Sequence, residues 1–291
     1  MNHNTEQGVL FVVATPIGNL QDITYRAVEV LKQVDIIVVE DSRHSARLLQ
    51  HYNIKAKTYT LHDHNERENS TKLLKKLLAG ASIAIISDAG TPLVSDPGYV
   101  LVNEVIRNQV KVVPIPGPSA LIGALSVAGL PTDRFCFEGF LPAKSVARLN
   151  RLKQLLVEPR TMIFYEAPHR ILATLRDMVT VFSGIRQAVI ARELTKTFET
   201  LQRDSLDALV EWVDQDQNQQ KGEIVLLVHG APERQHSDDD IDRLLSVLMA
   251  DMPLKKASDL ASQITGIKKN QLYQRGLALK SNASTDPKPP Q

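Results

Sequence analysis

ISDAGTPLVSDPGYV, residues 86–100, carries the clearest indication of how this chain folds. It follows the apolar run Ser82–Ile86 and places two glycines and two prolines around Asp88 and Asp96. An apolar run that ends abruptly in Gly, Pro and Asp is typical of a buried parallel strand followed by a rigid loop. In open α/β sheets ligands bind at that edge. The alternative is a plain connecting loop, although such loops are usually shorter and poorer in proline. The stretch therefore predicts a ligand site.

The same construction occurs at two other places. A strand-like run that begins at Leu10 leads into the loop Thr15–Asn19. Another begins at Val110 and leads into Pro114–Ser119, and a fourth apolar run covers residues 35–39. Helix-like stretches separate these runs, at Thr24–Leu31, Ser42–Gln50, Ser70–Leu78 and Gly98–Arg107. The alternation predicts a parallel sheet with its loops gathered at one edge. No loop matches the usual NTP or dinucleotide motifs, so those ligands are not expected.

Length and composition indicate two domains with an appendage, because the chain has 291 residues of which 43% are hydrophobic. The single cysteine, Cys136, lies in the apolar run Phe135–Phe137, so we expect no disulfide framework. We expect the protein to work in a reducing compartment. The first eight residues, MNHNTEQG, have no signal-peptide character, and no apolar run approaches membrane-spanning length. We therefore expect a soluble, cytoplasmic protein with no membrane partner.

The basic residues are unevenly distributed, although the formal net charge is only +1. Between Phe140 and Arg176 there are seven basic and two acidic residues, and between Met252 and Lys280 six basic and one acidic. Two basic segments on a neutral chain could form a surface for a polyanion such as RNA. Solvated helix faces are the alternative, and they are the commoner outcome for charge runs.

The break at Gly129–Asp133 divides the main part of the chain into an α/β domain over residues 9–130 and another over 134–230. The second domain has four strand-like runs, at Phe135–Phe140, Thr161–Glu166, Gln187–Glu193 and Glu223–His229. Helical patterns separate them, at Ser145–Leu156, Arg170–Val181 and Ser205–Val213. A polar linker over 231–240 follows, and residues 281–291 have the composition of a disordered tail.

Residues 240–280 have the pattern of a helix-turn-helix unit. Three helices are expected, at Ile241–Met249, Lys255–Ile264 and Lys268–Lys280, with a tight turn at Thr265–Gly266. The expected buried positions are Leu260, Ala261, Ile264, Ile267 and Leu272. Such a unit could be only a packing module or a dimer contact. The basic residues of its last helix, Lys268, Lys269 and Arg275, favour nucleic-acid contact.

Charged residues follow several of the predicted strands. TMIFYEAPHR (161–170) ends in Glu166, His169 and Arg170, and ARELTKTFET (191–200) carries Glu193 and Lys196. Each has an ordinary alternative, such as a helix cap for Asp41 or a surface ion pair for Glu166 with Arg170. Together, at one edge of several strands, they predict a polar cleft. The chain has no HExxH, Cys/His cluster or GxSxG, so zinc and serine-hydrolase chemistry have no support.

A series of motifs at these positions closely resembles the tetrapyrrole (corrin/porphyrin) methylase superfamily, in its ribosomal RNA small subunit methyltransferase I branch. The motifs, in order, are VATPIGNLQDIT, VEDSRHSARLL, SDAGTPLVSDPG, PGPSAL, FEGFLP, YEAPHR and ARELTKTFE. The resemblance implies two α/β domains with S-adenosylmethionine in the cleft between them, plus the C-terminal helix-turn-helix. It also implies methylation of the ribose 2′-oxygen of a cytidine in the decoding region of 16S rRNA, as free RNA or in the 30S subunit, by a homodimer that needs no metal.

The resemblance also assigns the cofactor residues. The cofactor would be held by Pro16, Ile17, Gly18, Asp88, Ala89, Gly90, Thr91, Ser119, Ala120 and Tyr165, and backbone groups near Phe164–Tyr165 and Glu223–Val225 would complete its pocket. The catalytic candidates are Glu166, His169, Glu193, Arg43 and Lys196, and Asp41 is expected to orient Arg43. Glu166 is favoured as general base, because it ends a strand directly before the Ala167–Pro168 turn. The RNA candidates are Lys144, Arg148, Arg151, Arg170, Lys268 and Lys269, the first three lying along one face of a helix.

Two rival functions remain open at this point. The first is a methylase of a small tetrapyrrole, which would have no use for the basic segments or the terminal unit. The loops Thr15–Gly18 and Ser87–Gly90 depart from the sequences of tetrapyrrole-methylating relatives, and this disfavours a porphyrin substrate. The second is a non-catalytic regulator whose helix-turn-helix binds DNA. The polar residues expected at the cleft exceed what ligand sensing requires.

Overall fold

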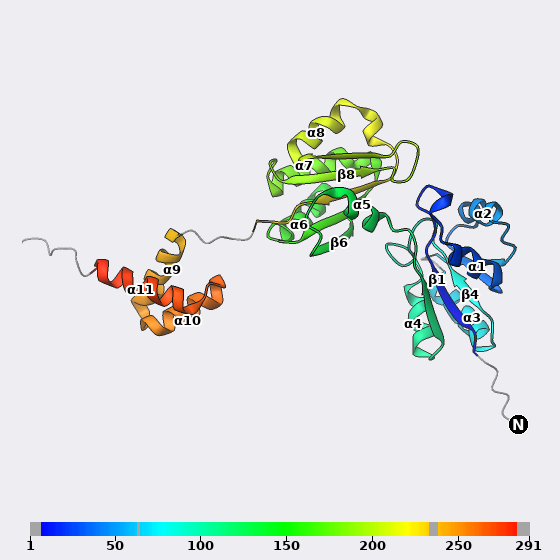
Figure 1. Cartoon of the computed structure of the whole chain (residues 1–291), viewed down its shortest axis with the longest axis horizontal. Helices are drawn as coiled ribbons and strands as arrows, with labels where there is room; N and C mark the ends of the chain where they lie inside the picture. Colours follow the sequence, from blue (N-terminus) through cyan, green and yellow to red (C-terminus); the bar gives the residue numbers. More distant parts are fainter. Residues whose placement is uncertain (1–6, 63–64, 233–237, 284–291) are drawn as a thin grey trace, which may run out of the picture. The chain divides into compact units, whose positions relative to one another are not determined.

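The computed structural model describes residues 7–62, 65–232 and 238–283 (Figure 1). The chain forms two compact units, divided between Ala231 and Pro232. The first unit contains two α/β lobes, and the second contains three helices; each unit is described by itself. The tail predicted over 281–291 lies outside the described residues from 284 onwards, as do residues 233–237 of the predicted linker. Among the described helices, none combines the length and the apolar character needed to cross a membrane.

The first lobe is built on five parallel strands in the order β3-β2-β4-β1-β5. Helices α3 and α4 pack on one face, where Leu10, Ile83 and Leu101 are fully buried, and α1 and α2 pack on the other. The elements are β1 (Val9–Val13), η1 (Leu20–Asp22), α1 (Tyr25–Gln33), β2 (Ile36–Val39), α2 (Ser42–His51), β3 (Lys57–Thr60), α3 (Glu66–Leu78), β4 (Ile83–Ile85), α4 (Tyr99–Arg107) and β5 (Lys111–Ile115). The predicted parallel sheet is confirmed, and β3 is an additional edge strand.

The second lobe has a mixed sheet in the order β6-β7-β10-β8-β9. Its central strand β10 runs antiparallel to both neighbours, so Ile224 at its start lies opposite Glu166 and Arg192 at their ends. The elements are α5 (Ala120–Ala128), β6 (Phe135–Phe140), α6 (Ser145–Gln154), β7 (Thr161–Glu166), η2 (Pro168–Arg170), α7 (Ile171–Phe182), β8 (Gln187–Arg192), β9 (Thr200–Ser205), α8 (Leu206–Gln215), η3 (Gln217–Gln220) and β10 (Ile224–Val228). Strand β9 was not predicted.

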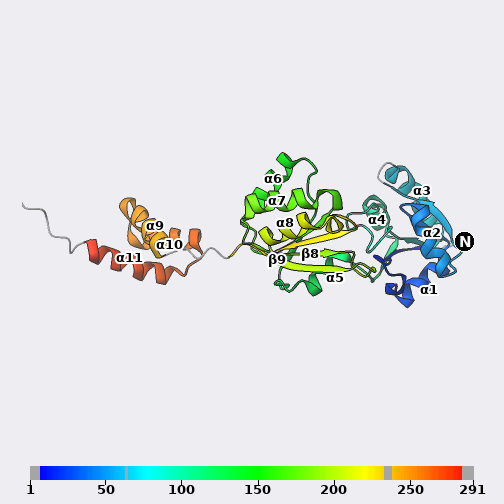
Figure 2. The same ribbon diagram turned by 90° about the horizontal axis from the view of Figure 1, so that it is seen from above.

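Helix α5 follows the last strand of the first lobe but packs on the sheet of the second. Its buried residues Leu121, Ala124 and Leu125 contact strands β7, β8 and β10. Helices α6, α7 and α8 cover the opposite face of the same sheet (Figure 2). The sequence break near Leu130 therefore lies after α5, a helix that already packs in the second lobe. The chain passes from the first lobe to the second earlier, just before Ser119.

The second unit consists of α9 (Asp238–Asp251), α10 (Leu254–Thr265) and α11 (Lys269–Ala283), with the turn at Gly266 where it was expected. Ala261 and Leu272 are buried in its core together with Ile241 and Leu245. Two predicted core positions are wrong, because Leu260 is 37% and Ile264 56% exposed. The core is formed instead by α9, whose Asp242 carboxylate also accepts hydrogen bonds from Arg275 on α11.

Candidate active site

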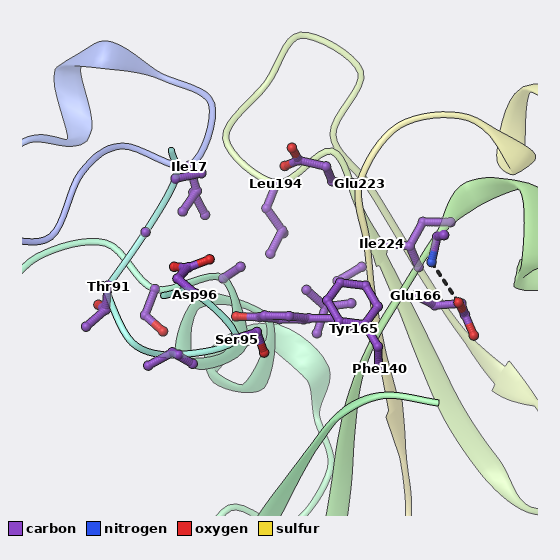
Figure 3. A pocket seen from close by; sticks show the side chains of 18 of the residues that line it. Ile17, Thr91, Ser95, Asp96, Phe140, Tyr165, Glu166, Leu194, Glu223 and Ile224 are labelled. Atoms are coloured by element: carbon purple, nitrogen blue, oxygen red, sulfur yellow. Dashed lines mark hydrogen bonds between the residues drawn. The ribbon is translucent and has the colours of Figure 1, made fainter. Parts of the chain in front are cut away.

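A cavity of about 360 Å³ lies between the two lobes of the first unit (Figure 3). Its walls come from the loops that follow β1, β4 and β5, from the ends of β7 and β8 and from the start of β10. Most wall groups are apolar, including Ile17, Val94, Phe140 and Leu194. A few polar groups converge among apolar walls, which is the usual composition of a small-molecule site. A cleft is therefore present where it was predicted and both lobes contribute to it, but its walls are mainly apolar rather than polar.

The loops on the first-lobe side are tied to one another by hydrogen bonds. The backbone of Thr15 exchanges two bonds with Gly90, with N···O distances of 2.8 and 3.0 Å. Thr91 Oγ1 donates to the carbonyl of Pro118 at 3.0 Å, which links the third loop to the second. Gly90 has a φ of +83°, a conformation that strongly favours glycine. These bonds hold three strand-end loops in one wall of the cavity.

Two ionisable side chains give the cavity its chemical character. The pKa of the Asp96 carboxyl is raised to about 6, chiefly by burial; a hydrogen bond with Ser87 opposes this rise, and the neighbouring charge of Asp88 adds to it. Burial also raises the pKa of the Tyr165 hydroxyl. Figure 3 shows the Tyr165 ring extending into the cavity, with its hydroxyl directed toward Ser95 and Asp96. A desolvated carboxyl beside an aromatic ring suits a cationic ligand, whose charge would favour the ionised form.

Seven of the ten predicted cofactor residues line this cavity: Ile17, Ala89, Gly90, Thr91, Ser119, Ala120 and Tyr165. The other three, Pro16, Gly18 and Asp88, are not among the lining residues. The Asp88 carboxylate accepts a hydrogen bond from the Asp41 backbone N at 3.3 Å and pairs with His44. Gly18 lies against Lys196, where a β-carbon would come within 2.4 Å of the lysine Cγ.

Several lining residues were not predicted as site residues, among them Val94, Asp96, Phe140 and Leu194. Asp96 belongs to the same Pro/Gly/Asp loop as the predicted residues, so the loop composition already pointed to it. Glu223, Ile224 and Val225, which the resemblance assigned to the cofactor pocket, also line the cavity, at the amino end of the antiparallel strand β10.

Glu166, the favoured general base, is committed to a buried hydrogen-bond network. Its side chain is 1% exposed. Oε1 accepts from the Ala167 backbone N at 2.7 Å and from Arg170 Nε at 2.9 Å, and Oε2 accepts from Thr174 Oγ1 at 2.6 Å. Figure 3 shows the carboxylate turned away from the labelled Asp96 and Ser95. This geometry suits an anchor of the β7–α7 junction and does not suit a base, so we correct the prediction.

Glu193, Lys196 and Glu223 form a charged cluster beside the cavity. Lys196 Nζ lies 2.8 Å from Glu193 Oε1 and 3.1 Å from Glu223 Oε2, and Glu193 Oε1 also accepts from the Glu223 backbone N. The methylene stem of Lys196 rests on Gly18, so the loop after β8 packs against the loop after β1. The cluster therefore joins the two lobes at the rim of the cavity.

The remaining catalytic candidates lie elsewhere. His169 is exposed in η2. Arg43 lies in the first lobe on the first turn of α2, and its side chain is 89% exposed. Asp41 orients it as predicted, with Asp41 Oδ2 2.8 Å from Arg43 Nη2, while Asp41 Oδ1 caps the helix through the Arg43 backbone N. This contact lowers the pKa of Asp41 to about 2. The five candidates thus do not form one cluster.

The predicted RNA-binding face of α6 is only partly present. Lys144 is exposed, but Arg148 is 4% exposed and donates to Asp177 at 2.7 Å and to the carbonyl of Ala143. Arg151 pairs with Glu138 and remains partly exposed, and Arg170 is held by Glu166. The helix spacing was correct, but α7 packs against α6 and covers Arg148. The Arg148 prediction is therefore wrong, since a buried, paired guanidinium cannot contact phosphate.

Substituting Arg148 with alanine is expected to destabilise the protein by about 2 kcal/mol, because Asp177 would keep a largely buried charge with only Ser145 as hydrogen-bond donor. Lys144→Ala, at the exposed N-cap position of the same helix, is the matched control and is expected to leave stability within about 0.5 kcal/mol. Urea unfolding of both variants measures the difference. Equal stabilities would mean that the Arg148 pair contributes nothing to the fold.

In the second unit, Lys268 is exposed and Lys269 Nζ lies 2.6 Å from Asp259 on α10. Arg275 pairs with Asp238 and Asp242 of α9, so its role there is structural. The exposed basic groups of this unit are thus fewer than its sequence suggests. Over residues 7–62, 65–232 and 238–283, no group of three or more His, Cys, Asp or Glu side chains is placed to hold a metal ion.

Two families of known proteins account for almost the whole chain. Tetrapyrrole (Corrin/Porphyrin) Methylases match residues 9–210, which include the first lobe, most of the second lobe and most of the cavity walls, while β10 and the wall residues Glu223–Val225 lie beyond the match. The RsmI C-terminal HTH domain matches residues 235–280, which include α9, α10 and most of α11. The lobes and the cavity between them thus have the architecture of this class of methylase.

The comparison with curated proteins narrows this class. Ribosomal RNA small subunit methyltransferase I of Vibrio cholerae serotype O1 is 56% identical over 272 residues, covering 92% of this chain and 94% of that protein. The protein of the same name from Escherichia coli O157:H7 is 53% identical over 275 residues, covering 94% and 96%. The chain belongs to the tetrapyrrole methylase family and, within it, to the ribosomal RNA small subunit methyltransferase I family.

Solved structures confirm the fold alone. The methyltransferase CobJ superposes with a TM-score of 0.58 at 19% identity, covering 78% of this chain and 96% of that one. Diphthine synthase superposes with a TM-score of 0.58 at 16% identity, covering 76% and 94%. The two-lobe architecture is thus shared with proteins of different names, and the function has to be argued from the site and from the closer relatives.

Proposed function

We propose that this protein uses S-adenosylmethionine to methylate 16S rRNA, at the ribose 2′-oxygen of a cytidine in the decoding region. The observation that carries the proposal is the identity of 53–56%, over more than nine tenths of the chain, to proteins named ribosomal RNA small subunit methyltransferase I. The choice of oxygen and nucleotide comes from the motif resemblance described above. The cavity between the lobes supports the proposal, because its residues suit the cofactor.

The wall groups fit S-adenosylmethionine in both shape and charge. An adenosine ring system needs apolar walls, and Ile17, Val94 and Leu194 provide them. The cofactor also carries a sulfonium and an ammonium, and Asp96 supplies a carboxylate for such a cation, whereas the Glu223 carboxylate is paired with Lys196. When bound, S-adenosylmethionine supplies a methyl group that is already activated for transfer. The protein therefore has to align the ribose oxygen, exclude water and accept a proton.

The RNA is proposed to bind over the exposed basic groups of both units. Arg43 and Lys144 in the first unit and Lys268 in the second present cationic groups to solvent. Such contacts position a nucleic acid through its phosphates without reading its sequence. These phosphate contacts distinguish the proposed function from that of a tetrapyrrole methylase, which would not need them.

The test uses the purified chain, S-adenosylmethionine labelled in the methyl group, and four acceptors: 30S subunits, naked 16S rRNA, DNA and a porphyrin. We expect label in RNA at a single cytidine, in a linkage that resists alkaline hydrolysis because the 2′-oxygen is blocked. Label in the porphyrin alone would support the small-molecule rival. Cofactor binding without transfer to any acceptor would favour the regulator.

Removing the second unit is expected to separate RNA affinity from cofactor affinity. Each unit has its own buried core, so a chain that ends at Ala231 keeps the whole cavity. We expect an affinity for S-adenosylmethionine within about twofold of the full chain, and an RNA affinity about tenfold lower with a shallower salt dependence. Filter binding at several salt concentrations measures this.

The full chain carrying Lys268→Ala is the point-variant control, because that side chain is exposed on the second unit. It is expected to change RNA binding in the same direction by a smaller amount. If the truncated chain binds RNA as tightly as the full chain at every salt concentration, the second unit is a packing module.

A further inference from the structure

Phe140 is an exposed aromatic residue in the wall of the cavity. It lines the cavity next to Tyr165 and is 56% exposed (Figure 3). Other apolar wall residues are far more covered, since Ile17 is 9% and Val225 5% exposed. Exposure alone would carry little, because single apolar side chains are common on protein surfaces. The case for Phe140 comes from the way in which its strand positions it.

A β-bulge in β6 turns Phe140 toward the cavity. Phe137 lies opposite Ile163 of β7, and Phe140 lies opposite Tyr165, so three residue steps in β6 match two in β7. Side chains alternate between the two faces of a strand, so residues three apart would normally point to opposite faces. Because Glu138 is an extra residue, Phe137 and Phe140 both contact Tyr165, with ring centroids 4.8 and 5.7 Å from its own.

The bulge is held by two features of its own sequence. Gly139 has a φ of +63°, a conformation that glycine adopts without steric cost. The carboxylate of Glu138 forms an ion pair with Arg151 on α6, which covers the opposite face of the sheet. Bulges often occur next to active sites, where they redirect a side chain. The strand is therefore built to direct the Phe140 ring at the cavity.

Phe140 lies where the cavity opens to solvent. A β-carbon at Gly139 would be 3.9 Å from Ser95 Oγ, so this part of β6 lies close to a loop of the first lobe. Ser95 also lines the cavity and is itself exposed. The rings of Phe140 and Tyr165 meet at 64° and are not stacked on each other. The Phe140 ring is therefore accessible to a flat group that enters from solvent.

We propose that Phe140 binds the base of the target nucleotide by stacking and so places its ribose at the cofactor. This inference rests on the proposed function. To bring one ribose into a cavity between two lobes, the nucleotide has to leave the stack of its neighbours. Proteins bind such extruded bases on aromatic side chains, which replace the lost stacking. Every base has an aromatic face, so the Phe140 ring supplies position and not base identity.

The first test measures kcat/KM for the RNA acceptor that receives the label in the transfer experiment. We expect Phe140→Ala to lower it by about 10- to 100-fold, the effect of losing one stack between a base and an aromatic ring. Phe140→Trp keeps an aromatic face and should stay within about threefold of the wild type. Phe135→Ala is the matched control, because Phe135 begins the same strand and does not line the cavity.

The second test removes the base in place of the ring. The acceptor is an RNA whose target nucleotide has hydrogen in place of its base but keeps the ribose and its 2′-hydroxyl. On this acceptor the wild type should lose about as much kcat/KM as Phe140→Ala loses on the normal one. Phe140→Ala should distinguish the two acceptors by less than about threefold, because the partner of the base is already absent. Equal discrimination by both proteins would mean that ring and base do not interact.

The outcomes separate this inference from the proposed function. If the wild-type protein transfers no methyl group to RNA, the proposed function fails and the role of Phe140 fails with it. If the wild type methylates RNA and Phe140→Ala keeps its kcat/KM within threefold, the stacking role alone is overturned.

The cofactor supplies the remaining comparison, because its adenine could also stack on a ring. We expect Phe140→Ala to bind S-adenosylmethionine within about twofold of the wild type in calorimetry. An affinity that falls as far as kcat/KM would assign the ring to the cofactor and overturn the inference. Thermal unfolding checks each variant, and Phe140→Leu, which keeps an apolar side chain without a flat face, replaces an unstable alanine variant with the same expected loss.

Discussion

Asp96→Asn is expected to weaken binding of S-adenosylmethionine by about 10- to 100-fold at pH 8, the range for removing a charged hydrogen-bonding partner. The carboxyl of Asp96 is desolvated in the cavity, and burial raises its pKa to about 6. A bound cation would lower the pKa of Asp96 again, because its positive charge favours the ionised carboxylate. We propose that S-adenosylmethionine is the cation that binds beside this side chain.

The direction of the pH dependence follows from that raised pKa. Above pH 6 the carboxylate is already ionised in the free protein, so binding proceeds without proton release. Below pH 6 the carboxyl must lose a proton when the cation binds, so the affinity falls as the pH falls. Between pH 8 and pH 5 the wild-type affinity should decrease by about tenfold. The Asp96→Asn variant should show no such decrease, and the two proteins should approach each other at low pH.

Isothermal titration calorimetry from pH 5 to pH 8 measures both quantities. Asp88→Asn is the matched control, because Asp88 belongs to the same loop but its carboxylate faces Asp41 and His44. That variant is expected to bind the cofactor within about threefold of the wild type. An Asp96→Asn protein that retains the wild-type affinity and pH dependence would remove Asp96 from the cofactor site.

Glu166→Ala is expected to destabilise the protein by about 3–5 kcal/mol, the effect of leaving one partner of a buried ion pair without the other. The Glu166 side chain is 1% and the Arg170 side chain 18% exposed, so the lost charge cannot be replaced readily by water. Alanine would also leave Thr174 Oγ1 and the Ala167 N–H without their acceptor. The end of β7 and the start of α7 would lose the group that joins them.

Urea unfolding measures the loss, and Glu166→Gln is the control that separates structure from chemistry. Glutamine keeps an acceptor for the Ala167 N–H and the volume of the side chain, so its stability should lie between those of the wild type and the alanine variant. Its single-turnover methylation rate should stay within about threefold of the wild type, a barrier change below about 0.7 kcal/mol. A much larger loss of rate in a stable Glu166→Gln protein would restore Glu166 as the base.

Most strands could be predicted from the sequence because they contain an apolar run, and the two that could not are edge strands of mainly polar sequence. Strand β3 (Lys57–Thr60, KTYT) and strand β9 (Thr200–Ser205, TLQRDS) lack the apolar run that identifies a strand. Strand β6 (Phe135–Phe140) is also an edge strand without a fully buried residue, but its sequence FCFEGF is largely apolar and could be predicted. The same limitation explains Ile264, which has the spacing of a core position but faces solvent because α9 supplies the core.

The loops of the site could be predicted, whereas the directions of their side chains could not. Asp88 and Asp96 belong to one motif of alternating Gly, Pro and Asp, and composition does not distinguish them. Only the folded loop places Asp96 in the cavity and turns Asp88 toward His44. Arg148 shows the same limit on a helix, since the spacing gave its face correctly but not the packing of α7 against that face. The local sequence pattern identifies the loop or the helix, but the tertiary packing determines which groups each side chain contacts.

The position of β10 has a consequence for how the protein is made. This strand is the last of its sheet to leave the ribosome, yet it occupies the centre between β7 and β8. Until β10 is synthesised, β7 and β8 each have an unpaired edge in the nascent chain. The apolar side of α5 also stays partly uncovered, because β10 is one of the strands on which it packs. We therefore expect the second lobe to close only after nearly all of the first unit has been translated. Its assembly depends on long-range strand pairing, which is slower than the formation of local contacts.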